Sequence, residues 1–185
     1  KVAENPSHLS MLRAAEHVGS IEKPVVGALN GDALDQGLEL ALACDLRVGA
    51  RDSKFGLTHL ERGHIPWDGG TQRLPRLIGQ SRAIEMLLTC RKLSTDEALS
   101  IGLVNLVVEP MEVLSQSMEL ATGIASHGPI AARYAKEAVD KGMDLTLGQG
   151  LRLEADLSFL LQSTSDRAEG IASFLERRSP DYKGQ

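Results

Sequence analysis

The chain has 185 residues, 42% hydrophobic and 24% charged, so it holds enough apolar material for a folded core. Its formal net charge of −5 argues against a surface built to follow a phosphate backbone, so nucleic acid is not an expected partner. No apolar stretch is long enough to span a bilayer, and the first residues lack the apolar core of a signal peptide, so we expect no membrane partner.

The two cysteines favour a reducing compartment. Cys44 and Cys90 stand in apolar surroundings, without CxxC or cysteine–histidine spacing. We therefore expect buried free thiols, with neither a disulfide nor a metal site. The expected location is the cytoplasm, or the mitochondrial matrix if the source is a eukaryote.

Strands dominate the first part of the chain. An amphipathic helix with Ser7 as its N-cap is predicted over residues 7–20. A short buried strand that ends in an Asn-Gly turn follows it, then the helix that contains Glu39, then two extended segments. The predicted strands are 24–30, 45–50 and 54–56. Residues 57–70 form a loop rich in side chains that bind or catalyse.

Helices dominate the second part. Ser94 and Glu97 form a capping-box signature for a short helix that ends at Gly102, and an apolar strand follows at 103–108. A last helix opens near Asp166, with Glu169 as its capping-box partner. The other predicted helices are 71–78, 81–89, about 110–126, 129–142 and 146–163. We predict a single α/β domain over residues 1–185.

Glu39 is the only charged residue in the otherwise apolar segment 37–44. A helix that is apolar all round is normally buried, and burying a carboxylate costs several kcal/mol or so unless it is paired, hydrogen-bonded or protonated. A buried carboxylate of this kind suits a general acid/base. The alternative is a structural acid held by a buried arginine such as Arg47.

The residues before Glu39 suggest an anion site. A strand and a tight turn lead directly into the Glu39 helix, so free backbone N–H groups are expected beside the carboxylate. Such groups attract a developing negative charge. An acid/base beside an anion site suggests carbonyl chemistry.

Several motifs occur along the chain in a consistent order and spacing. They are Lys23-Pro24-Val25-Val26 with Asn30-Gly31, the helix Gly37–Asp45, Lys54-Phe55-Gly56, Gly63-His64-Ile65-Pro66 with Gly69-Gly70-Thr71-Gln72-Arg73-Leu74, Ala98 with Gly102-Leu103-Val104, and Phe174-Leu175-Glu176-Arg177-Arg178 with Lys183-Gly184. Together they resemble the crotonase (enoyl-CoA hydratase/isomerase) family over almost the whole chain.

The resemblance implies an α/β fold of repeated ββα turns stacked into a spiral, with a helical C-terminal part that builds homotrimers or hexamers. Residues 1–108 would form the remaining spiral core and residues 109–185 the helical region. It also implies an acyl-CoA substrate and no cofactor beyond the coenzyme A of that substrate. Family members begin with strands that match nothing here, so we expect the N-terminal strands to be missing from this chain.

In that family two backbone N–H groups hold the thioester oxygen and stabilise an enolate. The resemblance implies one donor at Gln36, with Gly37 beside it, and places the other in the missing N-terminal strands. Asp35 adds a carboxylate where hydratases usually have glycine. We interpret it as the N-cap of the helix behind it.

Two further departures from the hydratase pattern fall in the 57–70 loop. The second catalytic glutamate of hydratases falls at His59, which either moves a proton or is a structural or surface histidine, with Glu61 as an alternative. Asp68 is similar to an aspartate used by naphthoate synthases, alicyclic 2-keto-acyl-CoA hydrolases, aryl-CoA dehalogenases and some isomerases of the family, or it is an N-cap. Trp67 either lines an acyl pocket or packs in the core.

The cationic C-terminus completes the candidate site. Arg177, Arg178 and Lys183 are ordinarily a solvated helix end, but the resemblance suggests that Arg178 and Lys183 meet CoA phosphates across a trimer interface.

Three functions stay open at this point. The leading hypothesis is a lyase that hydrates a 2-enoyl-CoA, with Glu39 aided by His59 or Asp68. A hydrolase or isomerase that uses Asp68 on a cyclic or branched acyl-CoA is nearly as well supported. The third is a non-catalytic structural or RNA-binding member, which Asp35 and the missing first donor favour and the retained Glu39 disfavours.

Overall fold

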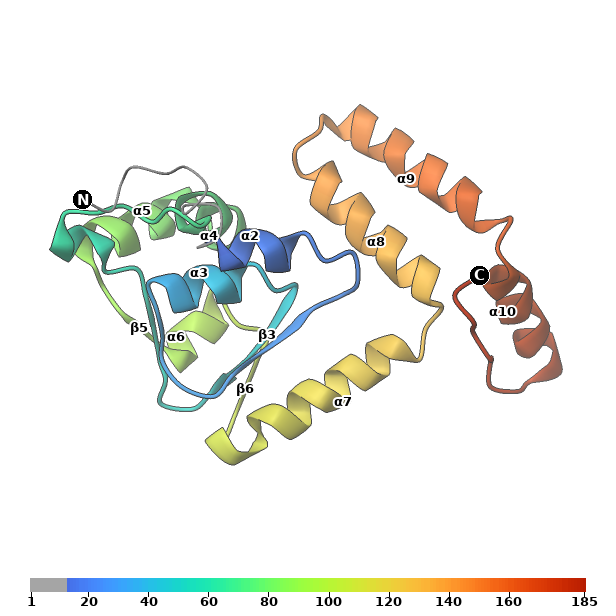
Figure 1. The fold of residues 1–185 in the computed structure, drawn as a ribbon, viewed down its shortest axis with the longest axis horizontal. Coiled ribbons are helices and arrows are strands. Elements are labelled where there is room, and N and C mark those ends of the chain that lie inside the picture. Colours follow the sequence, from blue (N-terminus) through green and yellow to red (C-terminus); the bar gives the residue numbers. More distant parts are fainter. Residues whose placement is uncertain (1–12) are drawn as a thin grey trace. The chain divides into compact units, whose positions relative to one another are not determined.

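The computed structural model describes residues 13–185, so the first part of the predicted 7–20 helix, with Ser7, lies outside the described residues (Figure 1). Contacts divide the chain into two units. The first runs to Ile21 and continues over Val25–Leu120, and the second joins Glu22–Pro24 to Ala121–Gln185. Each unit is described by itself below.

The first unit repeats a strand–strand–helix pattern. After α2 (Ala14–Gly19), the first turn consists of β1 (Val26–Leu29), β2 (Ala33–Leu34) and α3 (Gln36–Leu42). The second consists of β3 (Leu46–Ala50), β4 (Lys54–Gly56) and the 3₁₀ helix η1 (His59–Arg62). The remaining elements of this unit are α4 (Gly70–Ile78), α5 (Gln80–Thr89), β5 (Leu93–Ser94), α6 (Thr95–Ser100), β6 (Leu106–Val108), η2 (Pro110–Glu112) and most of α7 (Val113–Ala125).

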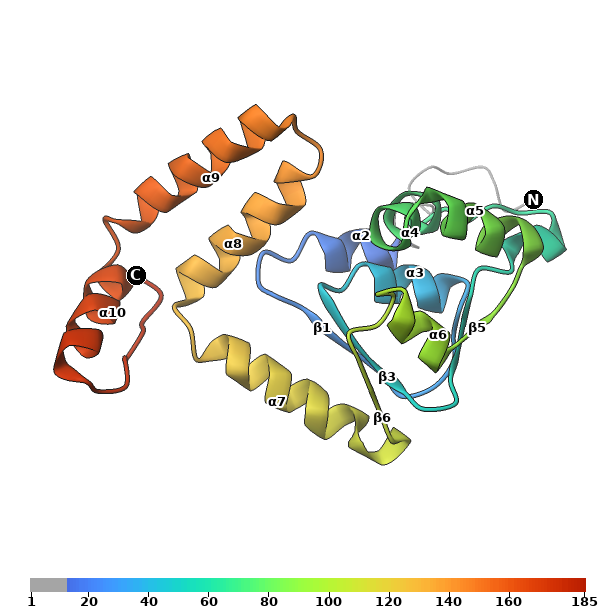
Figure 2. The same cartoon turned by 180° about the vertical axis from the view of Figure 1, so that it is seen from behind.

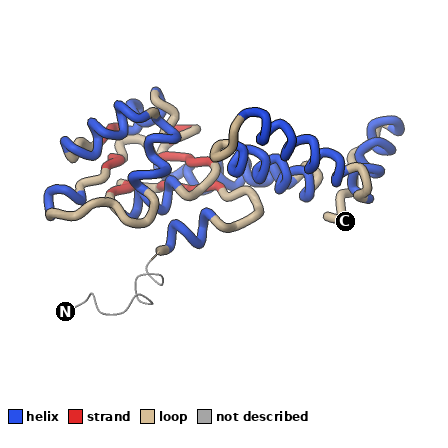
Figure 3. Tube along the Cα trace, turned by 90° about the horizontal axis from the view of Figure 1, so that it is seen from above, coloured by secondary structure: helices blue, strands red, loops and turns tan. Residues whose placement is uncertain are grey.

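The first strand of each turn joins one sheet and the second strand joins another. One sheet has the order β1-β3-β6, all parallel, and the other has the order β2-β4-β5, with β5 antiparallel. Figure 2 labels β1, β3, β5 and β6, and Figure 3 draws the strands in red. Val48 of β3 pairs with Ala28 on one side and Leu106 on the other. This alternation is the stacked ββα spiral that the resemblance implied, although the short strands β2 and β5 were not predicted.

The core of the first unit surrounds α3. Leu38 and Phe55 are fully buried there, with Leu57 and Leu74 beside them. Glu39 is 0% exposed on the same helix, as its apolar neighbours predicted. The fold therefore places a carboxylate among side chains that cannot solvate it.

Arg47 is buried but does not hold Glu39, so the structural-pair alternative is wrong in this respect. Its Nε donates to the carbonyl of Leu103 at 2.7 Å, and its Nη1 donates to the carbonyl of Cys44 at 2.5 Å. A third contact reaches the Ala41 carbonyl at 3.5 Å. Arg47 thus satisfies carbonyls at the end of α3, where helices have unpaired acceptors.

We expect Arg47→Met to lower the free energy of unfolding by about 3 kcal/mol, because the buried carbonyls of Leu103 and Cys44 lose their donor. Urea denaturation would measure the loss. Arg51→Met is the matched control, since Arg51 forms an exposed ion pair with Glu109 whose removal should change stability far less. Equal losses in both variants would contradict this role of Arg47.

The second unit is built from helices, with α8 at Pro129–Gly142, α9 at Leu147–Leu161 and α10 at Ser165–Glu176, close to the predicted ranges. The Ser94–Glu97 capping box of the first unit is confirmed. The box predicted at Asp166 and Glu169 is wrong, because Thr164 caps α10. Asp166 accepts instead from the N–H groups of Lys183 and Gly184, at 2.7 and 2.8 Å.

Large apolar side chains lie exposed on the second unit. Phe174 is 82% exposed, and Leu147 and Phe159 are nearly as open. Cys44 and Cys90 are partly exposed and not buried as expected. Over the described residues, no helix combines the length and apolar character needed to cross a bilayer.

Candidate active site

One oxygen of Glu39 is fixed by two backbone N–H groups. Oε1 accepts from Asp68 N at 2.8 Å and from Gly70 N at 2.9 Å. Gly70 is the first residue of α4, so the carboxylate meets the positive end of that helix. These two bonds fix the direction in which the Glu39 side chain points.

Gly70 is required for this close approach. A Cβ added there would lie 2.8 Å from Pro66 Cβ and 3.1 Å from Glu39 Oε1. Any side chain would therefore displace either the loop or the carboxylate. The Gly69-Gly70 pair lets the backbone of the loop reach a buried acid.

The other oxygen of Glu39 has no hydrogen-bond partner among the described residues and is buried. The imidazole of His59 lies beside this oxygen, with Nε2 3.7 Å from Oε2. His59 begins η1 and is only 6% exposed, so it is not a surface residue. An unpaired buried carboxylate oxygen beside an imidazole nitrogen offers two polar atoms that one small polar group could bond.

Asp35 stands at the N-cap position of α3, but its side chain does not cap that helix, contrary to our interpretation. Its Oδ1 accepts from Thr58 N at 2.6 Å, and its Oδ2 pairs with Arg62. Burial raises the pKa of Asp35, yet the Arg62 and Thr58 hydrogen bonds together hold it below its ordinary value. Asp35 is therefore a charged carboxylate at neutral pH, beside His59. The sequence did not single out Thr58, and it offered Arg62 only as one polar residue of the 57–70 loop.

The Asp68 carboxylate is turned to α2. Oδ2 accepts from Ala15 N at 2.8 Å and Oδ1 from Glu16 N at 3.1 Å, so both oxygens bond the first turn of that helix. Asp68 contacts Glu39 through its backbone N–H. The N-cap alternative for Asp68 is wrong for α4, because Gly69 stands at that N-cap. The Asp68 carboxylate instead bonds the first turn of α2 from outside that helix.

The remaining loop candidates differ in position. Glu61 is exposed on η1, and Trp67 is partly buried. Gln36 and Gly37 are exposed at the start of α3, and a Cβ on Gly37 would meet nothing within 4 Å. Among the described residues, no hydrogen bond takes up the N–H of Gln36 or Gly37. These first-turn donors are therefore open to a ligand.

The C-terminal cations are paired within the second unit. Arg178 donates from both Nη atoms to the Glu169 carboxylate, with Nη2–Oε2 at 2.8 Å, and Nε donates to Glu176 at 2.6 Å. Lys183 Nζ donates to Asp181 at 2.8 Å. A CoA phosphate would have to compete with these carboxylates.

The Glu169 pair should make the second unit sensitive to acid. Hydrogen bonds from Arg178 and from Asp181 N lower the pKa of Glu169 to about 2. A depressed folded-state pKa gives stability that is present above the unfolded value and lost as pH falls, here between about pH 4.3 and pH 2. We expect Glu169→Gln to flatten the pH dependence of unfolding in that window, as followed by hydrogen exchange of α10. Glu154→Gln is the control, since Glu154 is an exposed carboxylate on α9. The same pH dependence of unfolding in both variants would contradict the prediction.

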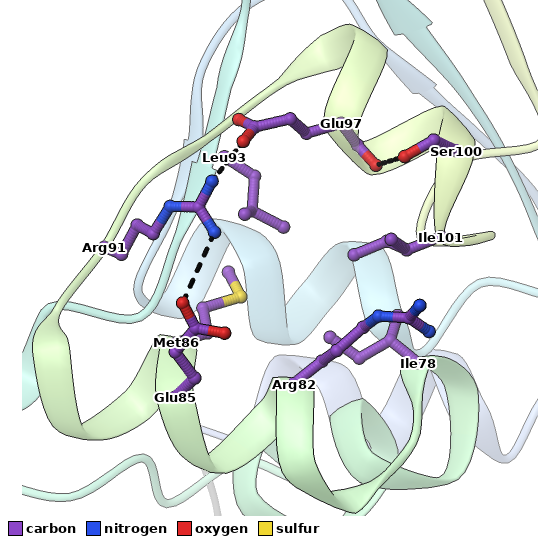
Figure 4. Close-up of a pocket in the computed structure, with 9 residues that line it drawn as sticks. All are labelled: Ile78, Arg82, Glu85, Met86, Arg91, Leu93, Glu97, Ser100 and Ile101. Carbon is purple, nitrogen blue, oxygen red and sulfur yellow. Dashed lines mark hydrogen bonds and ion pairs between the residues drawn. The ribbon is translucent and has the colours of Figure 1, made fainter.

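A cavity of about 210 Å³ lies apart from these residues, between α5 and α6 (Figure 4). Arg91 crosses its mouth toward Glu85 and Glu97. None of the candidate site residues lines it. Within the described part of the chain, no group of three or more His, Cys, Asp or Glu side chains could hold a metal ion.

The family model described as enoyl-CoA hydratase/isomerase matches residues 3–185. The chain belongs to this family. The expected crotonase membership and α/β fold are thereby confirmed.

Named relatives within the family are enzymes. The chain is 42% identical over 165 residues to crotonyl-CoA hydratase of Syntrophomonas wolfei, covering 89% of this chain and 64% of the relative. It is 39% identical over 158 residues to short-chain-enoyl-CoA hydratase of Clostridium acetobutylicum, covering 85% and 60%. The chain spans 55% to 66% of the length of eight such curated relatives.

The solved structures agree with the family assignment. Enoyl-CoA hydratase of Bacillus anthracis superposes with a TM-score of 0.93 at 44% identity. The match covers 99% of this chain and 73% of that structure. The two-sheet spiral and the helices after it are therefore those of the family.

Proposed function

We propose that this chain carries the proton-transfer part of an active site that adds water to the double bond of a 2-enoyl-CoA. The observation that carries the proposal is the asymmetry of Glu39. One oxygen is held by two N–H groups, while the other is buried, unpartnered and 3.7 Å from His59 Nε2. The hydratase names of the relatives support the same reaction.

The proposed chemistry uses Oε2 and Nε2 as a pair. Glu39 Oε2 takes a proton from water while the water oxygen bonds to C3 of the substrate. The electrons of the C2=C3 bond move to the thioester and form an enolate. The enolate then collapses as C2 takes a proton from His59 Nε2, and the proton on Glu39 returns to His59.

The enolate oxygen needs a separate anion site. We assign it to the first-turn N–H groups of α3, at Gln36 and Gly37, because they are exposed and the described residues leave them unbonded. The family resemblance implies that the second N–H donor comes from the N-terminal strands found in other family members. Trp67, which is partly buried and directly precedes Asp68, is assigned to the acyl pocket.

The other functions have less support. A hydrolase or isomerase built on Asp68 needs a free carboxylate, whereas both Asp68 oxygens bond α2. A non-catalytic member would have no use for a buried Glu39 with one oxygen left open. We therefore rank hydration first.

We also propose a homotrimer or hexamer. The exposed apolar side chains of the second unit, among them Leu147, Phe159 and Phe174, give such an assembly surface to bury. In such an assembly, Arg178 and Lys183 of one chain would bind the phosphates of the CoA held by a neighbouring chain. Light scattering of the full-length protein should give the mass of three or six chains, and a monomer at micromolar concentration would contradict the assembly.

We place the protein in the cytoplasm or, in a eukaryote, the mitochondrial matrix.

The reaction is tested by its product. Full-length protein would be incubated in ¹⁸O-labelled water with linear and cyclic enoyl-CoA and ketoacyl-CoA thioesters. Hydration predicts a 3-hydroxyacyl-CoA that carries one ¹⁸O at C3 with its thioester intact. Free CoA would indicate a hydrolase, an unlabelled isomer would indicate an isomerase, and an unchanged panel would favour the non-catalytic alternative. Each of these three outcomes would reject hydration.

A further inference from the structure

Asp35 occupies a backbone position that side chains rarely take. Its φ is +51°, in the left-handed region, where glycine is the residue without steric cost. Its N–H donates to the Gly56 carbonyl at 2.8 Å, so the strained position is fixed to β4. A carboxylate kept at such a position has a role that glycine could not supply.

The Asp35 carboxylate holds the segment that carries His59. Oδ1 accepts the N–H of Thr58, both oxygens lie 3.1 Å from Thr58 Oγ1, and Oδ2 pairs with Arg62. Thr58 and Arg62 flank His59 in the sequence and lie at the two ends of η1. Asp35 therefore joins the start of α3 to both ends of the turn that presents the imidazole.

The imidazole lies between two carboxylates. His59 Nδ1 is 3.4 Å from Asp35 Oδ1, and Nε2 is 3.7 Å from Glu39 Oε2. Nδ1 is buried and has no hydrogen-bond partner with proper geometry among the described residues. A buried imidazole nitrogen needs a partner, and Asp35 Oδ1 is the acceptor within reach.

We propose that Asp35 is a positioning residue that keeps a proton on His59 Nδ1 and thereby aims Nε2 at Glu39 and the substrate. The inference rests on the proposed function. Nδ1–H donates to Asp35 Oδ1 throughout, while Nε2 gives its proton to C2 and regains it from Glu39. Asp35 keeps its negative charge and balances the imidazolium before the transfer. An aspartate–histidine pair thus stands where the resemblance implies a second glutamate.

Asp35→Asn tests the pair, because asparagine has nearly the same shape as aspartate and removes only the charge. In the full-length protein we expect kcat on a linear 2-enoyl-CoA to fall about a hundredfold, with KM changed by less than about threefold. Asp32→Asn is the matched control. Asp32 Oδ1 also accepts a backbone N–H, from Lys54 at 2.8 Å, but it has no contact with His59 among those described. This control should keep both constants.

Two readouts separate positioning from simple structural support. ¹⁵N NMR of the ligand-free protein should show both His59 nitrogens protonated in the wild type and one of them deprotonated in Asp35→Asn, because asparagine carries no charge to balance an imidazolium. In a double-mutant cycle, Asp35→Asn should add nothing to His59→Gln, because it acts through that ring. An unchanged protonation of the His59 ring in Asp35→Asn, or additive losses, would overturn the inference while leaving the proposed function standing. A different result would reject the proposed function: near-normal turnover of Glu39→Gln, whatever the NMR spectra show.

Discussion

Replacing Glu39 by glutamine should lower kcat for hydration by about a hundredfold or more. The glutamine carbonyl can still accept the N–H groups of Asp68 and Gly70, so the side chain keeps its anchor. What the variant loses is the second oxygen, which is the proton acceptor in the proposed reaction. Because the buried contacts persist, the thermal unfolding temperature should change little.

Steady-state kinetics on the substrate identified for the full-length protein would measure the loss. Glu61→Gln is the control, since Glu61 is an exposed carboxylate on η1, close in sequence but not bonded to Glu39. It should leave kcat intact. Near-normal turnover of Glu39→Gln on the true substrate would remove Glu39 from the mechanism.

The second large effect is expected at His59. His59→Gln removes the group that gives a proton to C2, so kcat should fall about a hundredfold while acyl-CoA still binds. Asp68→Asn should reduce kcat by less than about tenfold, because its carboxylate bonds the N–H groups of Ala15 and Glu16 and not the reacting atoms. Its main cost should be about 1 kcal/mol of stability, as for the loss of a helix cap.

The order of these two variants separates the alternatives. Parallel measurement of kcat, of acyl-CoA affinity by calorimetry and of unfolding free energy would assign each effect. A severe loss of turnover in Asp68→Asn with a mild one in His59→Gln would favour the hydrolase or isomerase. Comparable, small losses in both would leave Glu39 to work alone.

Local patterns predicted the burial of Glu39 well. A helix that is apolar on all sides is buried, so its single charged residue is buried with it. The strand and turn before the helix fix where it starts. The environment of Glu39 therefore follows from residues within one ββα turn. The Gly69-Gly70 pair likewise marked a close approach, although its partner, Oε1 of Glu39, lies 31 residues away along the chain.

Side-chain partners across the spiral could not be predicted in the same way. Asp35 has the local signature of an N-cap, but its acceptors are used by Thr58 and Arg62 of the next turn. Asp166 shows the same competition, since the returning C-terminal backbone takes its carboxylate and Thr164 caps the helix instead. When tertiary donors reach an Asp, they override its local preference.

A structure of the full-length protein bound to its 3-hydroxyacyl-CoA product would show whether Glu39 and His59 face the reacting carbons. The proposed mechanism predicts the C3 hydroxyl within about 2.6–3.2 Å of Glu39 Oε2, with His59 Nε2 facing C2. It also predicts that the thioester oxygen accepts the N–H of Gln36 or Gly37. An acyl chain bound elsewhere, or a product hydroxyl that bonds Asp68 while Glu39 Oε2 stays unpartnered, would contradict it.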